Sequence, residues 1–190
     1  MFIDYLSEQF RERAYADPKF RDAVNIVSMN SRGRVWVIGG FLYKTLIRAV
    51  HGTEVASKDF DFVVERARER LKLPDGWTSR TNRFGNPELS AAENQVDLVP
   101  LDNILYLRKM NLAPSIRNYL ASVNFDIFAL AFDLRDEAIV DGGGVSALER
   151  KVLRVHNLVM AEISAEIYGK SVNEMISSRA REIGFDAELV

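Results

Sequence analysis

A chain of 190 residues is long enough for one ordinary domain with a hydrophobic core, and it leaves little room for a second. Its 47% hydrophobic and 27% charged residues are typical of a globular protein in water, and the formal net charge of -2 excludes a broadly basic surface for nucleic acid. The absence of cysteine excludes disulfides, the start lacks a signal-peptide pattern, and no stretch is apolar enough to cross a membrane, so we expect a cytoplasmic protein without membrane contact.

The first half of the chain predicts helices and strands in alternation. In chain order we expect a helix over 2–14, a second from Asp17-Pro18 to about 31, a strand over 35–38, a helix over 41–49, a strand over 59–64 and a short charged helix over 66–71. Gly39-Gly40 interrupts the chain between the first strand and the third helix. This order favours a small sheet with helices packed on it.

The second half continues the mixed pattern. We expect strands over 77–81, 96–100, 127–134, 138–140 and 152–155, and helices over 102–109, 114–120, 158–167 and 171–183. Ser171 with Glu174 is typical of a capping box, and Gly184 of a helix end. The predicted class is α+β, as a single domain over 1–190 with a helical arm (1–31), a catalytic core (32–156) and a helical tail (157–190).

Two glycines and three aspartates, in a fixed order, form the most informative pattern. In an extended strand residues i and i+2 point to one face, so Asp59 and Asp61 aim both carboxylates at the same place. Asp97 is the third carboxylate, inside an apolar strand where an unpaired buried charge would be costly. Gly39 and Gly40 precede a helix, where free backbone amides favour a phosphate.

Carboxylates this close repel unless a cation lies between them. Mg²⁺ prefers such hard oxygen ligands, and two ions held this way can stabilise both the attacking and the leaving oxygen of a phosphoryl or nucleotidyl transfer; Mn²⁺ is the alternative ion. We therefore predict metal binding and catalysis by Asp59, Asp61 and Asp97. The competing interpretations are a solvated pair at 59 and 61 and an exposed Asp97.

With these residues in view, the chain resembles the polymerase-beta-type nucleotidyltransferase superfamily, and most of all the head domain of bacterial poly(A) polymerases and CCA-adding enzymes. The family's Gly-Gly turn, Asp-x-Asp strand and third carboxylate match Gly39-Gly40, Asp59/Asp61 and Asp97. The segments 125–134, 139–144 and 152–155 are also similar to segments of that head. The resemblance implies a nucleoside triphosphate as substrate, with an RNA or tRNA 3' end as acceptor.

The chain departs from the family where the nucleotide is read. Where the family has Arg-Asp after the Gly-Gly turn, this chain has Tyr43-Lys44. Where the family has Arg-Arg-Asp, this chain has Ser-Val-Asn at 122–124. The family's Glu-Asp-x-x-Arg motif has no counterpart over 168–172. Lys44 and Asn124 remain candidates for nucleotide binding, although a solvated helix face and a structural hydrogen bond are equally good interpretations.

The predicted function is metal-dependent transfer of a nucleotidyl group from a nucleoside triphosphate to an acceptor hydroxyl, with release of pyrophosphate. The acceptor is an RNA 3' end, a small molecule or a protein, and a protein partner is a further expectation. The alternative is a catalytically silent nucleotide-binding or interaction module on the same fold. The altered nucleotide contacts favour that alternative, whereas three costly carboxylates argue against it.

Overall fold

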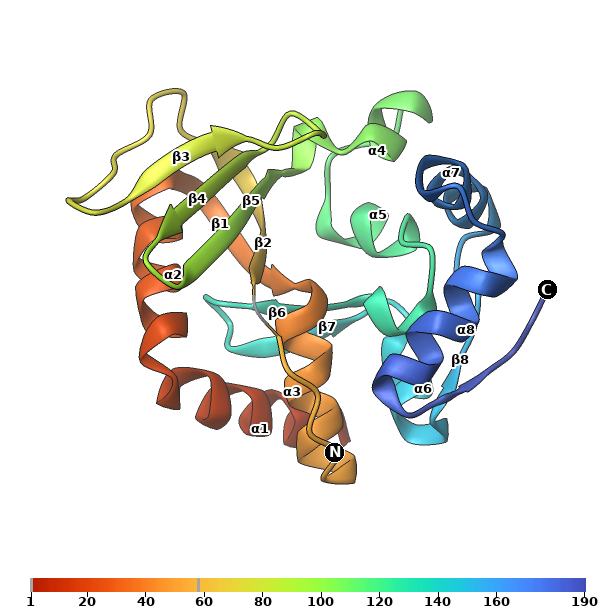
Figure 1. The fold of residues 1–190 in the computed structure, drawn as a ribbon. Coiled ribbons are helices and arrows are strands. Elements are labelled where there is room, and N and C mark those ends of the chain that lie inside the picture. The colour runs from red at the N-terminus through yellow and green to blue at the C-terminus, as the bar shows by residue number, and fades with distance from the viewer. Residues whose placement is uncertain (1, 58) are drawn as a thin grey trace.

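The computed structural model describes residues 2–57 and 59–190. The helices are α1 (Phe2–Ala16), α2 (Pro18–Asn30), α3 (Gly39–His51), α4 (Leu105–Lys109), α5 (Ile116–Ala121), α6 (Gly144–Arg150), α7 (Leu158–Tyr168) and α8 (Val172–Ile183), with 3-10 turns η1 (Leu101–Asn103) and η2 (Asp126–Phe128). None of the helices in these two ranges has the length and apolar character needed to cross a membrane. Figure 1 shows α1 and α2 on one side of the molecule and α7 and α8 on the other.

One mixed sheet forms the centre of the fold. The strands are β1 (Ser31–Ile38), β2 (Phe60–Ala67), β3 (Thr78–Thr81), β4 (Pro87–Ala91), β5 (Asn94–Pro100), β6 (Leu130–Asp133), β7 (Ala138–Asp141), β8 (Val152–Leu153) and β9 (Asp186–Ala187). The first seven are ordered β3-β4-β5-β2-β1-β6-β7, and β8 pairs separately with β9. Within the larger sheet β2 and β5 are parallel, and the other neighbours are antiparallel. The predicted α+β class with a small mixed sheet is confirmed.

The alternation of side chains along β2 divides the core between the two faces of the sheet. Phe62 and Val64 belong to the larger cluster, which includes apolar residues of α1, α2 and α3. Val63, between them, packs with Trp36 in a smaller cluster on the other face. The period of two thus fixes which face of the strand each residue uses.

The helices at both ends of the chain are part of this core. Phe10 of α1 and Phe20 of α2 are fully buried, and so are Ile176 and Ile183 of α8; all four belong to the same cluster as Phe62. The helical segments expected over 1–31 and 157–190 therefore both contribute side chains to this core.

Helix boundaries follow the expected signals. Asp17 caps α2 by accepting a hydrogen bond from the amide of Lys19. Ser171 and Glu174 form the predicted capping box of α8, and Gly184 ends that helix in the left-handed conformation with a φ of 71°. These local signals were sufficient because each concerns residues within one turn of the helix end.

The helix expected over 66–71 is wrong. Instead β2 continues to Ala67, with Arg66 paired to Arg32 and Ala67 to Ser31 of β1. An isolated helix of this length is marginal in water, so strand pairing with β1 outweighs the helical propensity of the charged residues. The expected strands over 77–81 and 96–100 are present, whereas β4 between them was not predicted.

Candidate active site

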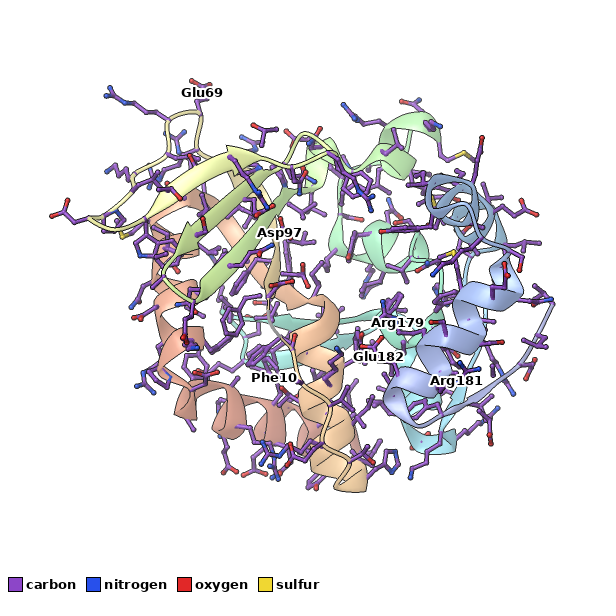
Figure 2. All side chains as sticks on the ribbon, in the orientation of Figure 1. Phe10, Glu69, Asp97, Arg179, Arg181 and Glu182 are labelled. Atoms are coloured by element: carbon purple, nitrogen blue, oxygen red, sulfur yellow. The ribbon has the colours of Figure 1, made fainter. Side chains whose placement is uncertain are left out.

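Three aspartates from two neighbouring strands line one cleft. Asp59 lies directly before β2, and Asp61 is the second residue of that strand. Asp97 lies in β5, where the parallel pairing places it opposite Asp61. All three line a cleft of about 1020 Å³, and Figure 2 labels Asp97 beside β5 and β2. The structure thus brings the three predicted carboxylates together, although they are up to 38 positions apart in the sequence.

Gly39 and Gly40 are the first two residues of α3, directly after β1, and Gly39 lies against Asp61. The backbone of Gly39 has a φ of 69°, and a Cβ atom there would lie 2.2 Å from Oδ2 of Asp61. A larger residue is therefore disfavoured both by conformation and by space. The amide of Gly40 donates a hydrogen bond to the Asp61 carboxylate. The glycine pair makes room for this carboxylate, and the first turn of α3, which has no side-chain cap, opens toward the same cleft.

The carboxylates lie in an environment that disfavours their charge. Burial raises the pKa of Asp61 to about 7, and the negative charges of Asp97 and Asp59 add to this rise. Burial also raises the pKa of Asp97, in part against a hydrogen bond from the Asn82 amide at 3.2 Å. Negative charge is thus concentrated in this part of the cleft. The hydrogen bond from the Gly40 amide offsets only part of the rise in the pKa of Asp61.

The donor set fits a hard divalent cation such as Mg²⁺, which prefers carboxylate oxygens. A cation between Asp59 and Asp61 would offset the repulsion that raises the pKa of Asp61. Within residues 2–57 and 59–190, no three acidic or histidine side chains are arranged to hold an ion as they stand, and Asp97 bonds to Asn82. Asp59 and Asp61 are therefore the first ligands to expect, and Asp97 would join them by leaving Asn82.

The raised pKa of Asp61 predicts how stability depends on pH without metal. Between the ordinary pKa and about 7 the folded protein binds the proton more tightly than the unfolded chain, so stability is lost as pH rises from 5 to 8. Over this range the loss is up to about 3 kcal/mol. We expect thermal melts in EDTA to show a falling Tm over this range, and Asp61→Asn to flatten it. A Tm that rises from pH 5 to 8 in both proteins would contradict this assignment.

Lys44 projects into the cleft but already has two partners. Its Nζ forms an ion pair with Glu182 of α8 at 2.8 Å and donates to the carbonyl oxygen of Ala56 at 2.8 Å. An ammonium has three donors, so one is left for a ligand. Arg48, one turn further along α3, pairs with Glu54 instead. Lys44 therefore links α8 to α3, while remaining available to a phosphate that displaces Glu182.

Arg179 is a residue of this cleft that the sequence did not single out. Its Nη1 lies 2.6 Å from Glu182 and donates to the hydroxyl of Tyr43 at 3.3 Å. Its guanidinium also covers the ring of Phe128, 5.5 Å from the centroid. Figure 2 shows Arg179 and Glu182 on the part of α8 that faces α3. One carboxylate, Glu182, thus accepts from two cleft cations, Lys44 and Arg179.

The signal in the sequence for Glu182 was Lys44 itself. The position has an acid in the resembling family but a lysine in this chain. A partly buried lysine needs a carboxylate, and Glu182 supplies it from α8. Arg179 brings a second cation to the same place, where its guanidinium bonds to Tyr43.

Asn124 lines the cleft but is engaged in local structure. Its side-chain oxygen accepts from the amide of Phe125, and its carbonyl oxygen accepts from the amides of His156 and Asn157. Asn124 therefore keeps only its side-chain NH2 group for a nucleotide.

Tyr119 lines another wall of the cleft. Burial raises the pKa of its phenol, and the nearby Asp61 carboxylate adds to this rise.

Solved structures with the same fold are CCA-adding enzymes. The Thermotoga maritima CCA-adding enzyme complexed with tRNA has a TM-score of 0.62 and 19% identity, over 97% of this chain and 42% of that one. A CCA-adding enzyme with ATP has a TM-score of 0.58 and 20% identity, over 91% and 40%. A complex with CTP has a TM-score of 0.57 and 20% identity, over 82% and 37%.

The chain therefore has the fold of the nucleotidyltransferase head, and it spans about two fifths of the length of these enzymes. No protein-family model and no curated protein matches its sequence.

Proposed function

We propose that this protein is a metal-dependent nucleotidyltransferase, which transfers a nucleotidyl group from a nucleoside triphosphate to an acceptor hydroxyl and releases pyrophosphate. The observation that supports it most is the placement of Asp61 opposite Asp97 on parallel strands, with Asp59 two residues earlier, in a cleft that also receives the first turn of α3. A partly buried group of like charges without a bound cation would only destabilise the fold.

Each carboxylate has a distinct proposed role. Asp59 and Asp61 hold the metal ions, and Asp97 orients the acceptor hydroxyl and accepts its proton. The acceptor oxygen then bonds to the α-phosphorus, the bond from that phosphorus to the oxygen bridging to the β-phosphate breaks, and pyrophosphate leaves. The bound Mg²⁺ ions would stabilise the charge on the attacking and leaving oxygens. The raised pKa of Asp97 suits it to accept a proton near neutral pH.

The triphosphate would bind between α3 and α8. A phosphate would lie at the start of α3, where the helix dipole favours an anion, against the backbone of Gly39 and Gly40; the Gly40 amide would reach it by leaving Asp61. Lys44 and Arg179 supply the two cations, and both already bind a carboxylate in this place. Glu182 thus occupies the position that a phosphate oxygen would take, and nucleotide binding would require it to move.

The acceptor is best supported as an RNA 3' end, since the structures of this fold include a complex with tRNA. The deciding experiment measures pyrophosphate release from each of the four nucleoside triphosphates with Mg²⁺, with and without bulk tRNA. Release that the Asp59→Ala/Asp61→Ala variant lacks would support the transferase, and stimulation by tRNA would support the RNA acceptor. Tight nucleotide binding without pyrophosphate release under every condition would favour the silent binding module instead.

A further inference from the structure

A second hollow, of about 700 Å³, is lined mainly by cations and lies outside the aspartate cleft. We define the arginine hollow by its five basic side chains, which come from the start of β1, the end of β2 and the loop after it: Arg32, Arg66, Arg68, Arg70 and Lys72. Two carboxylates, Glu69 and Asp102, complete its charged lining. This excess of positive charge stands out in a chain whose formal net charge is -2.

The five cations form no ion pair within the residues that the structure describes, although Glu69 and Asp102 line the same hollow. Their side chains form none of the ion pairs or hydrogen bonds found there, although eight other basic side chains do form ion pairs. The Nε atom of Arg68 is buried and has no hydrogen-bond partner. A buried donor without a partner is costly, and an acceptor from outside the chain would satisfy it.

Two of these cations are paired directly on neighbouring strands. Arg32 on β1 is the direct partner of Arg66 on β2. Like charges directly opposite one another on neighbouring strands destabilise the pairing. An anion lying between the two guanidinium groups would turn this repulsion into attraction, since arginine binds phosphate through paired N–H donors.

The loop that carries the other cations is fixed in place. Asn30, which is fully buried, donates from its amide to the carbonyl oxygen of Lys72 at 2.9 Å and accepts from the amide of Lys72 at 2.6 Å. The backbone carbonyl of Asn30 accepts from the amide of Arg68 at 2.9 Å. One buried residue thus takes part in three hydrogen bonds that hold the loop over 68–72. The backbone that carries these basic side chains is therefore already ordered before a ligand binds.

We propose that the arginine hollow binds the phosphate backbone of RNA and thereby anchors the acceptor of the proposed transferase. Several cations spread around one hollow match a polymer of phosphates better than a single small anion. A membrane surface fits less well, because the hollow has no large apolar side chain to insert into lipid. Along β2, Arg66 lies five positions after Asp61, about 17 Å at strand spacing, and strand alternation points the two side chains to opposite faces of the sheet. An RNA bound at both sites would therefore pass around the end of β2.

This inference rests on the proposed function for the role of the RNA, so its test must not depend on catalysis. The assay is fluorescence anisotropy of a labelled oligouridine of about 20 nucleotides, in EDTA and without nucleotide, over a series of salt concentrations. We expect Arg66→Gln/Arg70→Gln to weaken binding by about 10-fold or more and to lower the salt slope by about 1.4, the release expected for two phosphate contacts on a single strand.

The matched control is Arg150→Gln/Arg181→Gln, which removes the same charge from exposed positions on α6 and α8. An equal loss in the control, or a loss below about 2-fold in the hollow variant, overturns the proposal. The proposal is also overturned if the wild type binds phosphatidylserine vesicles instead of RNA and Arg66→Gln/Arg70→Gln abolishes that vesicle binding. RNA binding that depends on the hollow, in a protein that releases no pyrophosphate, would uphold this inference while the proposed function fails.

Discussion

Asp61→Asn is expected to abolish pyrophosphate release while making the metal-free protein more stable. The substitution removes a metal ligand, so we expect turnover to fall by about 10³-fold or more. It also removes a buried charge whose pKa is raised to about 7 by burial and by two neighbouring carboxylates. At pH 8 in EDTA, the free energy of unfolding should rise by about 1 to 3 kcal/mol, which is several degrees in Tm for a chain of this size.

A loss of activity together with a gain in stability would identify Asp61 as a functional residue. A structural aspartate, by contrast, would lose stability together with activity. Asp75→Asn, in the exposed turn before β3, is the control and should change neither quantity. Mg²⁺ should raise the Tm of the wild type at pH 8 more than that of the variant. If Asp61→Asn keeps its activity, or if it melts below the wild type in EDTA, the assignment of this residue is wrong.

Arg179→Ala is expected to raise the KM for the nucleoside triphosphate by about 10- to 100-fold, because a hydrogen bond to a charged group contributes about 1.5 to 3 kcal/mol. We expect a smaller effect on kcat, since the guanidinium would bind the phosphates in both the ground state and the transition state. Glu182→Gln is expected to act the other way. It removes the carboxylate that accepts from Lys44 and Arg179, so nucleotide should bind about 3- to 10-fold more tightly.

Arg181→Ala provides the control on the same helix. Arg181 is exposed and does not line the aspartate cleft, although it lies only two residues from Arg179, and Figure 2 labels both on α8. Kinetics over a range of ATP concentrations, with direct binding measured by calorimetry, would separate the three variants. Similar KM values for Arg179→Ala and Arg181→Ala, or weaker binding in Glu182→Gln, would refute the placement of the triphosphate between α3 and α8.

The part of the site that the sequence predicted consists of residues whose geometry is local. Asp59 and Asp61 share a face because of strand alternation, and Gly39 fits the turn from β1 into α3 because glycine tolerates a positive φ. Asp97 was found because a charged side chain in an apolar strand costs free energy unless it has a partner or a ligand. None of these inferences required knowledge of which helix packs against which strand.

The rest of the site depends on tertiary packing, which periodicity alone does not define. Arg179 and Glu182 come from α8, more than 130 residues after Lys44, and their meeting depends on how α8 rotates against α3. The error over 66–71 has the same origin, because the continuation of β2 is decided by pairing with β1. Three cations of the arginine hollow, Arg66, Arg68 and Arg70, therefore lay in what we expected to be a short charged helix.

The position of β1 in the sheet also has a consequence for biosynthesis. Its partner on one side, β2, follows within 30 residues, but its partner on the other side, β6, begins only at Leu130. Until the ribosome has produced that strand, the apolar edge at Trp36 and Val37 has no neighbour and can pair with other chains. The nascent chain is therefore exposed to aggregation at this edge from the synthesis of β1 until that of β6.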